Sequence, residues 1–560
     1  MNDELTDKGK VWRRFTDLMD ERKTKYDPMY KEIREFIHPA RGEFDNETAN
    51  DGRRKDKRLI DQTARRVANV MGAGMQGGLT PKSQEWFSLT FPDKELADYK
   101  PVREYLDKVK TRAYQIFELS NYYPTMFSCY QEFGTFSTAP LIMLEDDSRV
   151  IRCRSFTVGE YALGQDAGQE INTFARYIKM TIPQLVGYFG LENVSRRARE
   201  MYERHNVKDT ITVMHIIEPN DMYLPGAINS VRKPFRSIYW EEGCDDRNKL
   251  LRVSGFDEFP VFAGRWSIIG SRVYGEDGPG HNALGESKSL QLVQKDVLTA
   301  LELQIKPPTL VPNNLQLNMF PGGMTVYNSH QEQMSIKPLF ETQPNIRDTE
   351  YKVERIQEVI EKCFYYDLFL MASSADKTMT AYEMSVRQQE KLTVLGPAIE
   401  NWQSYVLRPA VNRCVSIAER RGLLPPPPEE IKGMELRDLD IEYTSIFAQA
   451  LKMLNKSTSI MEVVGFVNSL APTAPQVLDI INFDEAVNEF AMAKRAPQNI
   501  IRSDEEVAAI RQARDEKEQQ QQLAQLAPVA AQAAQSVKAL SEADTARRSA
   551  LSDMMGGPMF

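Results

Sequence analysis

Two glycine-dense stretches are the first candidates for chemistry in this chain of 560 residues. Gly72-Ala-Gly-Met-Gln-Gly77-Gly78 matches G-x-G-x-x-G, the fingerprint with which dinucleotide-binding folds hold a pyrophosphate. That fingerprint follows a strand and opens a helix, so that helical N–H groups meet the phosphates. Here a helical pattern over residues 59–72 precedes the glycines, and Leu79-Thr80-Pro81 follows them. The sequence therefore predicts glycines that end a helix and turn the chain, with an enzyme that binds a nucleotide at Gly72–Gly78 as the alternative.

Two further motifs lack the residues that would complete them. Gly270-Ser-Arg-Val-Tyr-Gly275-Glu-Asp-Gly-Pro-Gly280 has no terminal Gly-Lys-Ser/Thr, so it does not fit a P-loop and instead predicts a tightly packed structural turn. Ser374-Ala-Asp-Lys377 matches S-x-x-K, but the S-D-N and K-T-G companions of that nucleophile motif are missing.

Clustered carboxylates are the remaining candidates, because they could hold Mg²⁺ for phosphate chemistry. They are Glu145-Asp146-Asp147 and the group Glu241, Glu242, Asp245 and Asp246. No phosphate loop accompanies either cluster, and neighbouring carboxylates on a turn are usually only solvated. The five histidines (38, 205, 215, 281 and 330) show no zinc spacing. We therefore predict no catalytic residue, no metal and no cofactor, and a protein that is not an enzyme.

Composition limits the possible partners. Hydrophobic residues make up 42% of the chain, enough for three or four domains with substantial cores. No apolar run is long enough to cross a bilayer, the first residues do not resemble a signal peptide, and five scattered cysteines do not suggest a disulfide framework. These features predict a soluble protein made in a reducing compartment. The formal charge of −9 predicts that any contact with DNA is weak, or lets the DNA pass.

The elements that would position functional residues are two long helices, at about 284–306 and from about 345 past 364. Pro307 and Pro308 stop the first helix. Between the helices, alternating apolar residues at 315–319, a Pro321-Gly322-Gly323 turn and an extended 324–327 predict a small β module. This pattern predicts a hairpin-like tip on a two-helix stalk; two core helices of an ordinary globular domain are the alternative.

Helical periodicity assigns faces to both helices. The apolar faces comprise Leu290, Val293, Val297, Leu301 and Ile305 in the first helix and Val353, Ile356, Val359, Ile360, Cys363 and Phe364 in the second. Four glutamates form a stripe on another side of the second helix: Glu350, Glu354, Glu358 and Glu361. A solvated helix face, with Glu358 and Lys362 as an i,i+4 pair, explains the stripe equally well.

The rest of the chain predicts a helix-rich α+β fold. Helical patterns cover 10–37, split or bent at Pro28, and 93–120. Short strands separated by turns are expected at 141–144, 150–154, 173–180, 210–217, 235–241 and 250–254, with a helix near 182–205. They predict a mainly antiparallel sheet. A long helical stretch after 380 should kink at Pro397 and Pro409, and 503–506 is a capping box that opens a terminal helix.

These residues together resemble the head-to-tail connector, or portal, proteins of short-tailed bacteriophages. The resemblance covers most of residues 10–430 and rests on segments that occur in family order. They are Gly74-Met-Gln-Gly-Gly-Leu-Thr-Pro81 with Trp86-Phe87, Tyr274-Gly-Glu-Asp-Gly-Pro-Gly280 with Ala283-Leu-Gly-Glu-Ser-Lys288, Met379-Thr-Ala-Tyr-Glu383, Leu395-Gly-Pro397, and Leu407-Arg-Pro409 before Gly422-Leu-Leu-Pro-Pro-Pro-Pro. None of them is a catalytic signature.

The resemblance implies a ring, typically of twelve subunits, at one capsid vertex, through which double-stranded DNA is packaged, retained and ejected. It implies these domains: 1–265 wing, 266–306 first stem helix, 307–343 clip, 344–371 second stem helix, 372–380 channel loop, 381–430 kinked wing helix and Pro-rich linker, 431–503 crown, and 504–560 barrel helix and flexible tail. The implied partners are the terminase large subunit, a tail adaptor, and the major capsid and scaffolding proteins, with assembly in the host cytoplasm and no membrane.

The resemblance also assigns expected roles to residues. The channel would be lined by the four glutamates and by Ser374, Asp376 and Lys377. The clip would dock partners near Asn313, Asn314, Phe320, Tyr327 and His330. The apolar faces, at Leu290, Val293, Val297, Leu301, Val353, Ile356 and Ile360, would pack subunit against subunit. A virion scaffold protein without a channel is the remaining alternative.

Overall fold

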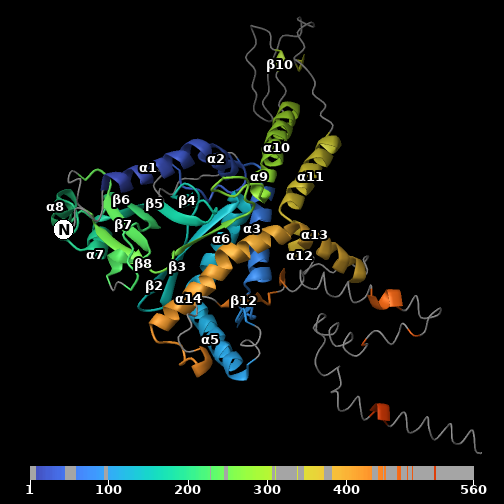
Figure 1. Ribbon diagram of the computed structural model, residues 1–560. Helices are drawn as coiled ribbons and strands as arrows, with labels where there is room; N and C mark the ends of the chain where they lie inside the picture. The colour runs from blue at the N-terminus through green and yellow to red at the C-terminus, as the bar shows by residue number, and fades with distance from the viewer. Residues whose placement is uncertain are drawn as a thin grey trace, which may run out of the picture. The chain divides into compact units, whose positions relative to one another are not determined.

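The computed structural model divides into two compact units, Met1–Lys452 and Met453–Phe560 (Figure 1). The structure describes residues 8–44, 59–93, 99–226, 229–244, 250–305, 309–310, 337–338, 346–370, 381–431, 439–445, 447–448, 463–467, 476, 482 and 510–512. Helices and antiparallel sheets together make up the first unit, which confirms the predicted α+β class. The capping box at 503–506 lies outside the described residues.

A five-stranded antiparallel sheet in the order β4-β5-β6-β7-β8 is the largest sheet of the first unit. Its strands are β4 (Tyr161–Gln165), β5 (Ile171–Thr181), β6 (Thr210–Pro219), β7 (Phe235–Glu241) and β8 (Arg252–Phe256). Helix α1 (Lys8–Lys25) covers one face of this sheet, where Phe15 meets Tyr177 and Trp240 edge-to-face at 5.1 and 5.3 Å. Pro28 sits in the first turn of α2 (Asp27–Phe36), which confirms the predicted split after α1.

The opposite face of this sheet packs against helices and against a second sheet. Side chains alternate along a strand, so Val213 faces away from its neighbour Met214 and contacts α7 (Ile182–Phe189) and α8 (Arg196–Glu203). The predicted single helix at 182–205 is therefore two helices, because Gly190 takes a positive φ of 86° after α7. The second sheet has the order β3-β2-β9, with β3 (Val150–Ser155), β2 (Thr138–Asp146) and β9 (Val261–Arg265).

The largest apolar core of the first unit is built mainly by five helices. They are α3 (Thr63–Leu79), α5 (Lys100–Leu119), α6 (Tyr122–Phe136), α13 (Ala381–Trp402) and α14 (Arg408–Arg420). Trp402 is fully buried at the centre, with its ring 5.0 Å from that of Tyr130 and 4.6 Å from that of Phe133. The core also ties distant parts of the chain together, since β1 (Phe87–Thr90) pairs with β12 (Asp440–Tyr443).

The predicted interruption near Pro409 takes the form of a π-helical segment. Gln403–Leu407 adopts this wider turn between α13 and α14, and the Arg408 N–H donates to the Gln403 carbonyl five residues earlier. Pro409, which has no N–H, then occupies the first turn of α14. Pro397, by contrast, lies inside a helix that continues from Ala381 to Trp402.

The glycine run at 72–78 corrects one prediction. Helix α3 does not end there but continues to Leu79. Three of the glycines instead allow close packing, because an added Cβ would lie 2.6 Å from the Gln131 side chain at Gly72, 2.1 Å from the Phe369 ring at Gly74 and 2.3 Å from the Phe447 ring at Gly78. An unbroken helix has no free N–H groups at these glycines for a phosphate. The structure therefore gives no support to a nucleotide site at Gly72–Gly78.

A separate pair of helices leaves this body. The short α9 (Pro279–Asn282) leads into α10 (Leu284–Ile305), and α11 (Ile346–Cys363) returns towards the body and is followed by α12 (Tyr366–Leu370) (Figure 1). Beyond the tips, β10 (Thr309–Leu310) pairs with β11 (Lys337–Pro338) in an antiparallel bridge. None of the described helices is apolar over a length that could cross a bilayer. The five cysteines are free thiols.

Candidate functional site

The two-helix stalk formed by α10 and α11 matches the predicted organising element. The two helices lie side by side and run in opposite directions (Figure 1). Their lower ends are anchored in the main core, where Leu290, Ile360 and Phe364 are fully buried. Towards the tip, Val293, Val297, Leu301, Val353 and Ile356 are only partly buried. The predicted apolar faces thus pack first against each other and the body within one chain.

Other apolar residues of the stalk are turned outward. Leu292, Leu298 and Ile305 of α10 are 60%, 49% and 74% exposed, and Tyr351 of α11 is 67% exposed. Ile305 was expected on the apolar face, but it is exposed because it lies near the tip of the stalk, beyond the body that buries Leu290. Leu298 and Ile305 are seven residues apart and share one side of α10, whereas Leu292 lies on another side.

The glutamate stripe on α11 has two kinds of environment. Near the base, Glu361 forms an ion pair with Arg66 of α3 at 2.9 Å. Glu358 lies 4.0 Å from Arg355 and 3.8 Å from Lys362, so the i,i+4 pair expected from the sequence is present. Glu350 and Glu354 are exposed, and neither forms an ion pair with another described residue. The negative charges of Glu350 and Glu354, in the upper half of the stripe, are therefore not compensated by a cation of the described residues.

A polar clamp fixes the stalk to the start of α3. The backbone N–H groups of Ile60 and Asp61 donate to Gln291 Oε1 at 2.7 and 2.9 Å, and Gln291 Nε2 donates back to the Asp61 carbonyl at 2.8 Å. From the other helix, Gln357 Nε2 donates to Asp61 Oδ2 at 2.8 Å. Asp61 Oδ1 accepts from the Thr63 N–H at 2.7 Å, so the same carboxylate also contacts the first residue of α3.

The glycine connector at 270–280 is the tight turn that the sequence predicted. Ser137, which has a positive φ of 61°, lies against it: the Gly278 N–H donates to Ser137 Oγ at 3.0 Å. An added Cβ would lie 2.2 Å from the Ser137 carbonyl at Gly275 and 1.9 Å from the Thr135 carbonyl at Gly280. His281 Nδ1 lies 2.7 Å from Ser137 Oγ, and burial lowers the pKa of His281 to about 4. This connector sets the direction in which the stalk leaves the body.

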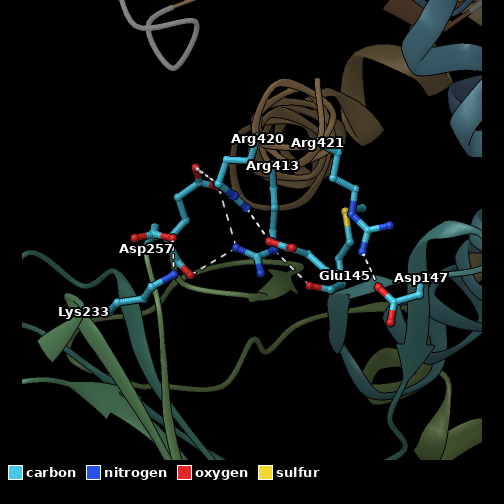
Figure 2. A network of polar contacts seen from close by, with 9 residues as sticks. Glu145, Asp147, Lys233, Asp257, Arg413, Arg420 and Arg421 are labelled. Carbon is cyan, nitrogen blue, oxygen red and sulfur yellow. Dashed lines mark hydrogen bonds and ion pairs between the residues drawn. The ribbon is translucent and has the colours of Figure 1, made fainter. Parts of the chain in front are cut away.

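An arginine network at the far end of α14 joins that helix to both sheets (Figure 2). Arg413 is buried and donates to the Met143 carbonyl at 2.9 Å and the Glu258 carbonyl at 3.2 Å. Arg420 pairs with Glu145 at 2.7 Å. Burial lowers the pKa of Arg413 to about 10, which leaves it charged at neutral pH. These arginines were not predicted from the sequence, where their only signal is a polar residue at 413 on the apolar side of a helix.

This network corrects the interpretation of the first carboxylate cluster. Glu145 and Asp147 are solvent-exposed, as expected, but they are also paired with Arg420 and Arg421, at 2.7 and 3.1 Å. Asp146 accepts hydrogen bonds from the Ser148 hydroxyl and the Arg149 N–H, which lower its pKa to about 2. The described part of the chain contains no group of three or more ligands that could hold a metal ion.

The other predicted chemistry is not brought together in the described residues. In the second carboxylate cluster, Glu241 is buried and accepts from the Ser195 N–H at 2.7 Å, whereas 245–246 lie outside those residues. Also outside them are the expected channel residues Ser374, Asp376 and Lys377 and the expected clip residues Asn313, Asn314, Phe320, Tyr327 and His330.

A buried Ser–His contact looks catalytic in outline but has the wrong chemistry. His215 Nε2 lies 2.9 Å from Ser237 Oγ, and Arg176 Nε donates to His215 Nδ1 at 3.1 Å. A base must accept the serine proton, yet an acceptor role for Nδ1 places the imidazole proton on Nε2, facing Ser237. Burial, with the Arg176 charge, also lowers the pKa of His215. All three side chains are at least nine-tenths buried, so this contact is part of the core.

Together these observations define an α+β protein whose most distinctive site is a two-helix stalk, rather than a pocket with converging catalytic groups. The chain matches, over residues 8–501, the family described as "Bacteriophage head to tail connecting protein". It therefore belongs to that family, and the resemblance found in the sequence is confirmed.

Two relatives cover nearly the whole chain. One is named as the portal protein of Salmonella phage epsilon15, and it is 34% identical over 513 residues, which is 91% of each chain. The other is named as a probable portal protein of Bordetella phage BPP-1, and it is 31% identical over 555 residues, which is 98% of each chain. Similarity over this length includes the stalk and both flanking regions.

Proposed function

We propose that this chain is the subunit of a phage portal, a ring at one capsid vertex through which DNA enters, is held and leaves. The observation that carries the proposal is the family match over residues 8–501, supported by relatives named as portal proteins over at least 91% of the chain. The exposed apolar residues Leu292, Leu298 and Ile305 support assembly, since a stalk in water would otherwise leave them uncovered.

The parts of the chain have distinct roles in this proposal. The body up to residue 265 is the wing, α10 and α11 are the stem, 307–343 is the clip, and 372–380 is a channel loop with Ser374, Asp376 and Lys377 towards DNA. Residues 381–430 complete the wing, 431–503 form the crown, and 504–560 form a barrel helix and tail. A ring of twelve copies, by analogy with the family, is the expected assembly.

Charge supports a conduit that does not grip its cargo. The chain has a formal charge of −9, whereas proteins that bind DNA tightly through phosphates usually carry a basic surplus. Of the four glutamates expected to line the channel, we propose that Glu358, on the side of α11 turned away from α10, faces the lumen, where like charge discourages adhesion of the duplex. Glu361 pairs with Arg66, and Glu350 and Glu354 lie with it on a flank of the stalk. The role is structural, with no chemical step.

Partners follow from the position in the virion. The clip, with Asn313, Asn314, Phe320, Tyr327 and His330, docks the terminase large subunit during packaging and a tail adaptor afterwards. A clip built of strands, as the sequence predicts, would suit such an exchange, because a strand edge can pair with one partner at a time. The wing contacts the major capsid and scaffolding proteins during assembly in the host cytoplasm.

A conditional knock-out of the gene in its phage tests this proposal. Without the protein, cells should accumulate heads that contain no genome and carry no tail, and a plasmid copy of the gene should restore infectious particles. DNA-filled, tailed particles made in the absence of the protein would contradict the proposal.

A further inference from the structure

The stalk has two flanks of different character. Along α11, Glu361, Gln357, Glu354 and Glu350 follow one another at spacings of four, three and four, which places them on one side. Cys363, Val359, Ile356 and Lys352 follow the same spacings on another side. At about 100° per residue, the two sets point about 160° apart. Between them lie Val353, Ile360 and Phe364, which face α10 and the core.

Contacts at the base of the stalk show where each of the two flanks lies. Gln357 and Glu361 contact Asp61 and Arg66, at the start of α3. Gln291 of α10 contacts the same segment, so both helices turn these residues to one side. On the other side, burial raises the pKa of Cys363, and the Glu286 carboxylate of α10 raises it further. The base of α10 therefore lies near that thiol.

The acidic flank, defined as Glu350 and Glu354 with Leu298 and Ile305, is exposed. Leu298 follows Gln291 by seven residues and Ile305 follows Leu298 by seven, so all three lie on the same side of α10. Arg66 is already paired with Glu361, and Glu354 lies seven residues, or about 10 Å, further along α11. The described part of the chain supplies no cation to Glu350 or Glu354.

The basic flank, defined as Lys352 and Arg355 with Ile356 and Val359, lies on the other side. Lys352 is exposed and forms no ion pair with a described residue, and Arg355 is 4.0 Å from Glu358. Ile356 and Val359 are half-buried beside these cations. On α11, each flank thus carries charge of one sign, and the two signs are opposite. On α10, exposed Lys295 and Glu302 share the side of Gln291 and offset each other, whereas exposed Asp296 points about 140° away from Gln291. The opposite signs of the flanks therefore come from α11, where Ile356 also packs partly against the main core.

We propose that the acidic flank of one stalk docks on the basic flank of the stalk in the next copy of this chain. The inference rests on the ring of the proposed function. A rotation about the ring axis does not change the height of a residue along that axis. Residues of α11 in one copy therefore meet the opposite flank of the next copy at the same height. Glu350 and Glu354 therefore meet Lys352 and Arg355, which alternate with them along the helix.

This arrangement gives the ring a direction and a register. Opposite flanks join head to tail and close a ring, whereas two acidic flanks repel each other and exclude a two-fold dimer of stalks. Exposed ion pairs act mainly on association rate and specificity, and they are screened by salt. We therefore expect assembly from subunits to slow as the salt concentration rises.

Charge reversal in the full-length protein tests the inference. One variant carries Glu350→Lys and Glu354→Lys, a second carries Lys352→Glu and Arg355→Glu, and a third combines all four changes. Each double variant should raise the protein concentration at half-assembly by about tenfold or more, since every boundary then joins like charges. The fourfold variant should return to within about threefold of the original protein, because all boundaries are again complementary.

The matched control is Arg196→Glu with Glu200→Arg, which swaps an exposed i,i+4 ion pair on α8, away from the stalk (Figure 1). It should assemble like the original protein, and melting temperatures should show that all variants fold. Double variants that assemble normally, or a fourfold variant that stays unassembled, would overturn the inference. If rings form normally but Glu350→Lys with Glu354→Lys alters DNA release, the acidic flank faces the channel and the inference is wrong. If the unaltered protein never forms rings, the proposed function itself fails.

Discussion

Single glycines in α3 show how residue size controls the core. Gly74 has the Phe369 ring within 2.1 Å of the position that a Cβ would take, and Phe369 Cβ itself lies at 2.8 Å, so the ring cannot simply rotate away. We expect Gly74→Ala to destabilise the protein by about 1–3 kcal/mol through overpacking. The melting temperature of the purified variant measures this effect.

Gly77 is the matched control in the same helix, because an added Cβ there would meet nothing within 4 Å. Alanine is a better helix former than glycine, so Gly77→Ala should be neutral or should stabilise by up to about 1 kcal/mol. Equal losses at both positions would contradict the packing explanation and would favour a special backbone conformation throughout the glycine run.

Buried and half-buried arginines of the α14 network should differ in their effect on stability. Arg413→Met would remove hydrogen bonds to the Met143 and Glu258 carbonyl groups and leave Glu258 with one cation fewer, so we expect a loss of about 2–4 kcal/mol. Arg421→Met removes a pair with the fully exposed Asp147 and one hydrogen bond to the Asp146 carbonyl, so it should cost less, about 1 kcal/mol. Thermal unfolding of both variants tests this order, which a larger loss for Arg421 would reverse.

Acid should weaken the connector at the stalk base through His281. Burial lowers its pKa in the folded protein to about 4, below the ordinary value of 6.5, so the unfolded chain binds the proton more readily. The stabilising contribution is complete above pH 6.5 and is lost as the pH falls from 6.5 towards 4. Between pH 7 and pH 5 this loss should be on the order of 2 kcal/mol.

His281→Asn keeps a polar group near Ser137 but cannot titrate, so its melting temperature should fall less steeply between pH 7 and pH 5. His205→Asn is the control, since His205 is exposed and its positive φ of 57° suits asparagine. An unchanged slope in the His281 variant would mean that another group causes the acid sensitivity.

At the scale of elements, periodic segments could be predicted from the sequence and aperiodic ones could not. The stalk helices repeat apolar residues at helical spacing, so their limits were predicted within a few residues. Helix α6 was missed because nearly all of its residues are buried, which removes the alternation that marks a helix. The β1–β12 pair was missed because Phe87 and Tyr443 lie far apart in the chain, and no local pattern encodes such pairing.

The candidate site shows the same division. The stalk and its glutamate stripe could be predicted because both depend on helical spacing alone. The role of Gly72–Gly78 could not, since the rings of Phe369 and Phe447 that occupy the space beside these glycines come from distant segments. The pairing of Glu145 with Arg420 also depends on tertiary structure, and a cluster of carboxylates looks the same with or without its cations.

The segment between the stalk helices is expected to serve partners rather than the fold. Deleting residues 313–330 should abolish tail attachment, because the proposed clip docks the adaptor. The melting temperature should change little, since the described core lies in the body and at the stalk base. Electron microscopy of particles made with the variant should show heads without tails. Tailed particles of normal infectivity would exclude this segment as the docking site.

For the whole molecule, the central claim is that copies of the chain surround a channel. The outward apolar residues of α10, the unpaired charges on both flanks of α11 and the acidic net charge are all features that a ring would use. A lone monomer would leave Leu292, Leu298 and Ile305 in water, with no benefit to the fold.

Native mass measurement of the purified full-length protein, combined with electron-microscope images of the same sample, tests this claim most directly. The account predicts a closed ring with a central opening and a mass equal to a fixed multiple of 64.0 kDa, expected to be twelve. A protein that remains a 64.0 kDa monomer at every concentration, or that forms only dimers without an opening, would contradict the account.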